Sequence, residues 1–331
     1  MTHRILITGA GGAAAVGLLK HLADDAAYEL LAGDVDPMAA GLYLVPEGRR
    51  FLLPRGDAPD FAAQLLALCV REGVGAVLPT VDAELLPVAE HRAAFEAAGV
   101  RCIVAAPEAL RACLDKAKLM ALAGDAAPRT AILDTAFDAS DWTFPVLAKP
   151  RSGSGGRGIR VLESEEALRQ EPRAGRDIVQ TFLPGMEYSV DVYARADGQV
   201  LAAVPRERLK VDSGVAVAAR TVHDEDVQRT ARELVTRLGL TGVCNVQLRR
   251  DVAGVPRLLE INARFPGTMA ITIASGVDMP RLWLREALDG ELVEGPLDFE
   301  NTALVRTWTE HVLGADELLT AKGTQHVSVA A

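Results

Sequence analysis

The sequence has few aromatic residues, no long apolar run and no excess of positive charge. Aromatic residues make up 5% of its 331 positions, although 49% are hydrophobic. Base-stacking surfaces use aromatic side chains and phosphate backbones are bound by net basic faces, whereas this chain has a formal charge of −10. No apolar run approaches the roughly 20 residues that a membrane span needs. We therefore expect neither nucleic acid nor a membrane as a partner.

Cysteine is also scarce. The four cysteines, Cys69, Cys102, Cys113 and Cys244, form no CxxC pair and have no neighbouring histidine cluster. We expect buried free thiols in a reducing compartment rather than a zinc site or disulfides. The apolar residues 5–7 form too short a run for a signal peptide, so a cytoplasmic location is expected.

The N-terminal third alternates predicted strands with predicted helices. The strands are predicted at residues 4–8, 30–34, 76–79 and 100–104, and the helices at 13–23, 60–72 and 84–98. Such alternation predicts a parallel sheet covered on both faces, with any ligand at the carboxyl ends of the strands. We place this α/β domain at residues 1–110, and the length of the chain leaves room for one or two further units.

A glycine-rich turn at residues 9–12 joins the first strand to the first helix. Gly9-x-Gly11 and the later Asp34 match part of a dinucleotide-binding fingerprint. The third glycine position holds Ala14, however, and no YxxxK or comparable hydride-transfer motif follows. NAD(P) binding, a structural turn and a site for another small ligand all remain open.

A second glycine-rich segment follows a predicted strand at residues 142–150. Lys149 lies near the end of that strand, and residues 153–158 contain four glycines. A flexible hairpin of this kind can close its backbone N–H groups over phosphate oxygens, with Lys149 as a point charge. It is not a Walker A motif, because the lysine precedes the glycines. A plain glycine-rich turn is the alternative.

The remaining pattern predicts further strands and helices. The strands are predicted at residues 128–133, 178–181, 186–193, 200–204, 243–249, 258–262 and 303–308, the helices at 110–123, 224–238, 270–274 and 279–288, and a loose tail from residue 322. Arg206, Arg208 and Lys210 alternate as a basic row after one of these strands. The row suits an anion, and a solvated edge is the alternative.

Polar side chains also alternate within residues 258–267. Glu260, Asn262 and Arg264 should share one face of a strand, because side chains two apart point the same way. Two oxygen ligands followed by a cation suit a divalent metal ion that carries phosphate. Antiparallel pairing with the preceding strand would bring Gln247 close to Glu260. An amphipathic edge strand with a solvated face is the alternative.

The order of these motifs resembles the ATP-grasp superfamily. The motifs are Asp115-Lys116 on a helix, Lys149 before a glycine-rich hairpin, Q-x-x-x-P-G-x-E at residues 180–187 and a Q…E-x-N-x-R hairpin at residues 247–264. The resemblance covers the whole chain and is closest to the carboxylate–amine ligases like the carbamoyl phosphate synthetase large subunit. It implies a parallel-sheet pre-ATP-grasp domain followed by a two-lobed α+β ATP-grasp fold. The implied units are residues 1–110, a small lobe with a glycine-rich lid at 111–183, and a large lobe with the metal site at 184–331.

The resemblance also implies how ATP is bound. The two lysines would neutralise the α and β phosphates, the glycine-rich loop would cover the triphosphate, and the linker after the strand at 178–181 would contact adenine and ribose. Thr181 stands where many members have an acidic residue, which leaves the adenine contacts open. The implied ATP-binding residues are Lys116, Lys149, Ser152, Gly153, Ser154, Gly155, Gly156, Gln180, Phe182, Leu183 and Glu187.

Two Mg²⁺ ions are implied as cofactors, with Mn²⁺ as an alternative. Gln247 and Glu260 would hold one ion and Glu260 and Asn262 the other, while Arg264 would stabilise the transferring phosphoryl group. Lys149 would act in catalysis as well as in binding. The candidates for contact with the acceptor carboxylate or the acyl phosphate are Arg206, Arg208, Lys210 and Thr268.

The implied reaction is an ADP-forming ligation. ATP would phosphorylate a small carboxylate, and an amine or similar nucleophile would displace phosphate from the acyl phosphate. Complete carbamoyl phosphate synthesis or biotin carboxylation is not expected at this length, and homodimers are common in the resembled family. An NAD(P)-dependent oxidoreductase and a non-catalytic nucleotide-binding protein are the competing hypotheses.

Overall fold

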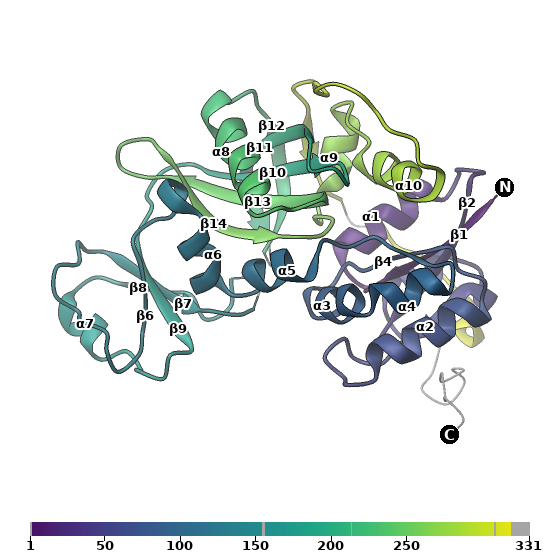
Figure 1. The fold of residues 1–331 in the computed structure, drawn as a ribbon, viewed down its shortest axis with the longest axis horizontal. Coiled ribbons are helices and arrows are strands. Elements are labelled where there is room, and N and C mark those ends of the chain that lie inside the picture. Colours follow the sequence, from purple (N-terminus) through teal and green to yellow (C-terminus); the bar gives the residue numbers. More distant parts are fainter. Residues whose placement is uncertain (1, 154–155, 213, 308, 319–331) are drawn as a thin grey trace.

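The computed structural model describes residues 2–153, 156–212, 214–307 and 309–318. The chain forms a five-stranded sheet within residues 3–102, a four-stranded sheet within 130–181 and a six-stranded sheet within 187–305. Figure 1 shows the first at the right, the second at the lower left and the third between and above them. A parallel-sheet domain followed by antiparallel-sheet lobes confirms the predicted fold class. Each predicted unit contains one sheet, and the boundaries themselves remain a prediction.

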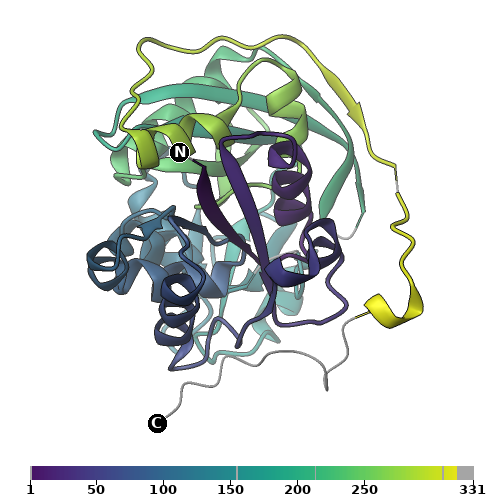
Figure 2. The ribbon, with the colours of Figure 1, turned by 90° about the vertical axis from the view of Figure 1, so that its right-hand side faces the viewer.

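The N-terminal sheet has the strand order β3-β2-β1-β4-β5 and is parallel. Its elements are β1 (His3–Thr8), α1 (Ala13–Leu22), β2 (Tyr28–Asp34), β3 (Arg50–Leu52), α2 (Phe61–Arg71), β4 (Ala76–Leu78), α3 (Asp82–Glu90), α4 (Arg92–Ala97) and β5 (Arg101–Cys102), and α5 (Pro107–Cys113) follows. Successive β1 residues face opposite sides, so Leu6 packs with α2 and α3 while Ile5 and Ile7 pack with α1. The view in Figure 2 shows α1 and the other helices on opposite faces of this sheet.

The small lobe has a core of its own. Its elements are α6 (Lys116–Leu122), β6 (Thr130–Ile132), β7 (Val146–Pro150), β8 (Arg160–Leu162), α7 (Glu165–Arg169) and β9 (Asp177–Thr181), with strand order β6-β9-β7-β8. Trp142, Val146 and Leu168 belong to a hydrophobic cluster separate from those of the other two units. Strands β7 and β8 pair with Ala148 opposite Arg160, which confirms the predicted hairpin around the glycine-rich loop.

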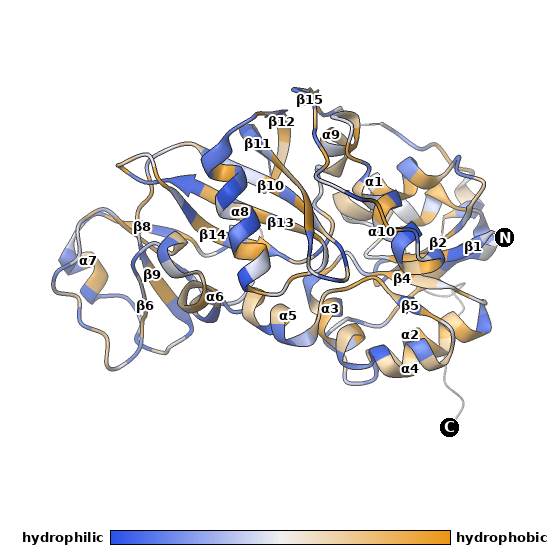
Figure 3. Cartoon of the chain, turned by 45° about the horizontal axis from the view of Figure 1, so that its top comes forward, coloured by the Kyte–Doolittle hydropathy of each residue, from blue (hydrophilic) through white to orange (hydrophobic). Residues whose placement is uncertain are grey.

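The large lobe carries one apolar and one polar sheet face. Its elements are β10 (Glu187–Ala194), β11 (Val200–Asp212), β12 (Val215–Thr221), α8 (Glu225–Arg237), β13 (Gly242–Arg250), β14 (Pro256–Asn262), α9 (Met269–Ala274), α10 (Met279–Asp289) and β15 (Ala303–Val305), in sheet order β14-β13-β10-β11-β12-β15. Val190 and Val192 pack toward α8, which turns its hydrophilic side outward (Figure 3). Ser189 and Asp191 therefore face the opposite side of the sheet.

Short 3-10 helices complete the described elements, at η1 (Ala40–Leu44), η2 (Glu47–Arg49), η3 (Gly124–Ala126) and η4 (Ala315–Glu317). None of the described helices has both the length and the apolar character needed to cross a bilayer. The four cysteines are free thiols, and the predicted burial is confirmed for Cys69, Cys113 and Cys244, while Cys102 is half-buried. Burial raises the pKa of the Cys69 thiol to about 12, which keeps it protonated.

Several predicted bounds are wrong for local reasons. The helix predicted at 110–123 is two helices, because Asp115 is extended and its carboxylate caps α6 by accepting the Ala117 N–H. The helix predicted at 84–98 divides at His91, and the strand predicted from residue 142 begins at Val146. Strand β12, built from small residues without polar alternation, was not predicted. Trp308 and the tail from residue 322 lie outside the described residues.

Glu84 is a buried acid beneath the carboxyl end of β1. It lies on α3, is 4% exposed and accepts a hydrogen bond from the Thr8 hydroxyl. Burial raises its pKa from 4.5 to about 7, the Thr8 hydrogen bond opposes this change, and the charge of Asp34 adds to it. The folded chain therefore binds a proton that the unfolded chain releases, so stability falls as the pH rises from about 4.5 to about 7.

Replacing Glu84 with Gln should stabilise the protein at alkaline pH, because Gln keeps an oxygen for Thr8 and carries no charge. We expect the free energy of unfolding to rise by about 2–3 kcal/mol at pH 8 and the gain to shrink toward zero near pH 5. Urea unfolding at both pH values measures this, with Glu90→Gln, an exposed position on the same helix, as the control. An equal gain at the two pH values would contradict the buried-acid explanation.

Candidate active site

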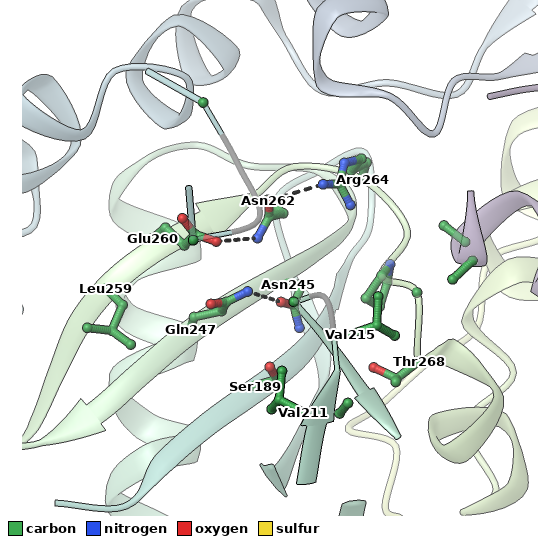
Figure 4. Close-up of a pocket in the computed structure, with 18 of the residues that line it drawn as sticks. Ser189, Val211, Val215, Asn245, Gln247, Leu259, Glu260, Asn262, Arg264 and Thr268 are labelled. Carbon is green, nitrogen blue, oxygen red and sulfur yellow. Dashed lines mark hydrogen bonds between the residues drawn. The ribbon is translucent and has the colours of Figure 1, made fainter. Parts of the chain in front are cut away.

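A cavity of about 820 Å³ lies where the three units meet. The N-terminal domain contributes residues at the carboxyl ends of its strands, including Gly9, Asp34 and Thr80, as the parallel-sheet prediction expects. The small lobe contributes the end of β7 and part of the glycine-rich loop, and the large lobe contributes its polar sheet face. Figure 4 shows this polar face.

The pairing of β13 with β14 sets the centre of the cavity. Gln247 lies opposite Glu260 and Asn245 opposite Asn262, so the predicted pairing of Gln247 with Glu260 is confirmed. Asn262 Nδ2 donates to Glu260 Oε1 at 3.4 Å, and the two side chains lie side by side in Figure 4. Although β14 is an edge strand, its polar face lines the cavity.

The oxygens of this pairing fit a hard divalent cation. The donor set is the carboxylate of Glu260 with the carboxamide oxygens of Gln247 and Asn262, all three lining the same cavity. Carboxylate and amide oxygens are ligands that Mg²⁺ and Mn²⁺ accept. The assignment of these three residues to a metal ion remains a proposal.

Two lysines flank Glu260. Lys116 Nζ lies 3.7 Å from Glu260 Oε2 and donates to the Gly153 carbonyl at 2.6 Å. Lys149 Nζ donates to the Leu259 carbonyl at 3.1 Å. Burial lowers the pKa of Lys149 to about 8, while the charge of Glu260 acts in the opposite direction and that of Lys116 lowers it further. The two cations therefore share one carboxylate within a buried site.

The expectation that Lys149 faces solvent is wrong. Its side chain is 5% exposed, because β7 lies inside the small-lobe sheet and its inner face abuts β14 of the large lobe. A role at the base of the cavity is compatible with this burial, since Lys149 still lines the cavity.

The glycine-rich hairpin forms the cavity wall beside the lysines. Ser152, Gly153 and Gly156 line the cavity, whereas Ser154 and Gly155 lie outside the described residues. Gly153 and Gly156 have φ values of 112° and 71°, a backbone region that favours glycine. The predicted covering of a triphosphate remains a proposal.

The predicted nucleotide linker is only partly in the cavity. Glu187 lines it and pairs with Arg208 at 2.9 Å. The buried side chain of Gln180 instead donates to the Thr130 hydroxyl, and neither Gln180, Phe182 nor Leu183 is among the described residues that line the cavity. The adenine contacts therefore remain a prediction.

The basic row does not form a solvated edge. Arg206 is 2% exposed, and its Nη2 donates to Asp191 Oδ1 at 2.9 Å. The register of β11 shifts between Arg208 and Lys210, and this bulge leaves Lys210 exposed and outside the cavity, contrary to the prediction. Arg206, Arg208 and Thr268 line the cavity as predicted.

Arg264 is held by the N-terminal domain. Its Nε lies 2.6 Å from Asp82 Oδ1, and its Nη2 donates to Asn262 Oδ1 at 3.3 Å. The predicted position beside the metal strand is confirmed. The pairing with Asp82 was not predicted, because the two residues are 182 positions apart.

The support beneath the site was also not predicted. Asp191 is fully buried and accepts hydrogen bonds from Asn245 Nδ2 at 2.7 Å and from the Thr272 hydroxyl at 2.6 Å, besides its contact with Arg206. The signal available in the sequence was the alternation of Glu187, Ser189 and Asp191, which continues the polar face across β10.

Family comparisons agree with this architecture. A family model described as ATP-grasp in the biosynthetic pathway with Ter operon matches residues 175–310. A second model, described as the PylC-like N-terminal domain, matches residues 5–103. The chain belongs to the ATP-grasp superfamily. This ATP-grasp protein has a PylC-like N-terminal domain and the fold of ATP-dependent ligases.

Sequence relatives are distant and longer. A carbamoyl-phosphate synthase of Methanobrevibacter smithii is 27% identical over 247 residues, which cover 68% of this chain and 65% of the synthase. This ATP-grasp chain spans less than two thirds of the length of the curated relatives it matches.

Solved structures share the fold. The biotin carboxylase domain dimer of Hydrogenobacter thermophilus 2-oxoglutarate carboxylase, in complex with MgADP, ADP and bicarbonate, has a TM-score of 0.69 at 18% identity, covering 91% of this chain and 72% of that one. An L-amino acid ligase of Bacillus licheniformis has a TM-score of 0.66 at 17% identity, covering 87% and 74%.

Replacing Lys149 with Met should separate its charge from its bulk. Met fills a similar volume without a buried cation, so we expect a melting temperature equal to or above that of the wild type. Binding of a non-hydrolysable ATP analogue with Mg²⁺ should weaken at least about tenfold, the loss of one charge-assisted phosphate contact. Calorimetry and thermal unfolding measure the two effects, with the exposed Lys118→Met as the control. Unfolding without a specific loss of nucleotide binding would instead make Lys149 structural.

Proposed function

We propose that this ATP-grasp protein is an ADP-forming, Mg²⁺-dependent ligase that activates a small carboxylate as an acyl phosphate and transfers it to an amine or similar nucleophile. The observation that carries the proposal is the position of Glu260 between Lys116 and Lys149, beside the oxygens of Gln247 and Asn262. Phosphoryl transfer needs this kind of positioning and charge neutralisation more than covalent chemistry by the protein.

The nucleotide-binding roles follow from the lining of the cavity. Lys116 and Lys149 would meet phosphate oxygens, the Ser152–Gly153 part of the hairpin would offer backbone N–H groups, and Glu187 would accept ribose hydroxyls. Mg²⁺, when bound by Gln247, Glu260 and Asn262, would supply further neutralisation of phosphate charge. Gln180, Phe182 and Leu183 are kept as candidates for the adenine side.

The acceptor side of the site is basic. Arg264 adjoins Asn262 and would face the transferring phosphoryl group, with Asp82 holding its orientation. Arg206, Arg208 and Thr268 would contact the acceptor. The enclosed position of the cavity between three units would limit the access of water to an acyl phosphate.

The relatives support this class of reaction. A ligase of amino acids and a carboxylase domain bound to MgADP and bicarbonate share the fold, which suits ATP with Mg²⁺, small-molecule acceptors and no polymer substrate. The carboxylase domain is a dimer, and we propose a homodimer for this chain by the same likeness.

The NAD(P) hypothesis is disfavoured by Asp34. Its Oδ2 accepts the Gly11 N–H at 2.7 Å and its Oδ1 accepts the Asp36 N–H at 2.9 Å, so both oxygens are already engaged where a ribose hydroxyl would have to bind. Thermal unfolding with each ligand discriminates between the two classes. We expect protection by a non-hydrolysable ATP analogue with Mg²⁺ and none by NAD(P).

Replacing Glu260 with Gln should abolish turnover while the protein stays folded. We expect a loss of about 10³-fold in ADP release on a panel of carboxylates and amines, about 4 kcal/mol, since the carboxylate that balances both lysines is removed. Glu163→Gln, at an exposed position of the small lobe, is the matched control. Near-normal ADP release by Glu260→Gln would sink the site assignment.

The same assay tests a non-catalytic nucleotide-binding role. Binding of the ATP analogue without ADP release on any acceptor pair in the panel would favour that role. ADP release that requires both a carboxylate and an amine would exclude it.

A further inference from the structure

The main cavity extends past the metal strand to the glycine-rich turn of the N-terminal domain. Gly11, Gly12 and the first residues of α1, Ala13 and Ala14, line the same cavity as Arg206 and Thr268. A Cβ added to Gly267 would lie 3.1 Å from Ala13 Cβ, so the turn after Arg264 touches the start of α1. In Figure 4 the purple N-terminal segment enters on the same side as Thr268. This end of the cavity has no role in the nucleotide chemistry proposed above.

The N-terminus of α1 opens into this end without a cap. Gly12 occupies the N-cap position and offers no side chain, and the first turn of this ten-residue helix has no acidic residue. Among the described residues, the N–H groups of Ala13 and Ala14 have no hydrogen-bond acceptor. Free N–H groups and the helix dipole make such a terminus attractive to an anion.

Arg206 and Thr268 face the same space with unused donors. Arg206 is 2% exposed, and while its Nη2 binds Asp191, its Nε has no partner in the described part of the chain. Thr268 is 5% exposed, and no described residue hydrogen-bonds its hydroxyl. Buried polar groups are nearly always paired, so these donors point to an absent acceptor.

The local charge has the sign that an anion needs. Arg206, Arg208 and Arg306 lie near one another, and the Nε atoms of Arg208 and Arg306 also lack described partners. Arg306 Nη2 donates to the Gly267 carbonyl at 2.5 Å, which braces the turn before Thr268.

Carboxylates at this end are already committed. Glu187 pairs with Arg208 and Asp191 with Arg206, which leaves the three guanidinium groups with two carboxylate partners. The carboxylate of Asp34, which also lines the cavity, is bound to the N–H groups of Gly11 and Asp36. One further anion would balance the cluster.

We propose that the start of α1, Thr268 and Arg206 form a subsite for a second, non-reacting anionic group of the acceptor substrate, a carboxylate or a phosphate. The proposal rests on the proposed ligase function, because it assumes that the reacting carboxylate lies beside the metal strand. Ser189 pairs with Arg206 on one side and with Gln247 on the other, so Arg206 lies two strand spacings, about 10 Å, from Gln247. The preferred acceptor is therefore a diacid or a phosphorylated acid rather than bicarbonate.

The test uses the full chain with its nucleotide site filled by a non-hydrolysable ATP analogue and Mg²⁺. Inorganic phosphate and glutarate are titrated separately by calorimetry, and crystals are soaked in selenate for its anomalous signal. We expect saturable binding of at least one probe and a selenate peak within hydrogen-bond distance of the Ala13 N–H and Thr268 Oγ1. The probe that binds more tightly identifies the anionic group as phosphate or carboxylate.

Two variants discriminate binding from structural damage. Gly12→Asp places a carboxylate at the N-cap, where it should stabilise α1 and occupy the anion position, so we expect a higher melting temperature with at least tenfold weaker probe binding. Gly17→Ala, in the middle of the same helix and with open space around its Cβ, should stabilise without weakening the probe. Thr268→Val should weaken binding several-fold, and Thr268→Ser should restore it.

The outcomes separate this proposal from the ligase proposal. Equal probe affinity in the wild type and Gly12→Asp, or selenate only at Lys116 and Lys149, would overturn the subsite. Repeating the titration without nucleotide tests the subsite even if the ATP analogue does not bind. Failure of the analogue to bind counts against the ligase function alone.

Discussion

The register between β13 and β14 is the constraint on which the rest of the site depends. It places Gln247 opposite Glu260 and Asn245 opposite Asn262, and β10 extends the same rows to Ser189. A slip of one residue would turn the oxygen ligands into the apolar face that packs against α8. The apolar residues between them, such as Val246 and Ile261, fix the register because they belong to the core.

Charge balance then explains why the three units meet at this sheet. Glu260 is the carboxylate between two buried lysines, one from α6 and one from β7, so its removal would leave two like charges close together. Arg264 on the large lobe and Asp82 on the N-terminal domain form a second link between units. Because the small lobe has its own core, these polar contacts rather than shared packing hold it to β14.

The sequence predicts what depends on local pattern. Period-two alternation found the strand of Glu260 and its pairing with Gln247, and ordered motifs found both lysines and the glycine-rich hairpin. It could not predict that Lys149 is buried or that Arg264 binds Asp82, because those facts depend on contacts 110 and 182 positions apart. The bulge that excludes Lys210 from the cavity also leaves no mark on the polar alternation of β11.

The most direct test of the central claim is a crystal structure of the full chain with a non-hydrolysable ATP analogue and Mn²⁺, read by anomalous scattering. Mn²⁺ reports the metal position independently of the nucleotide density. The account predicts a manganese peak within coordination distance of Glu260 and Asn262, with the triphosphate between that peak and Lys149. Nucleotide density at the turn of residues 9–12, or a manganese peak away from Glu260, would contradict it.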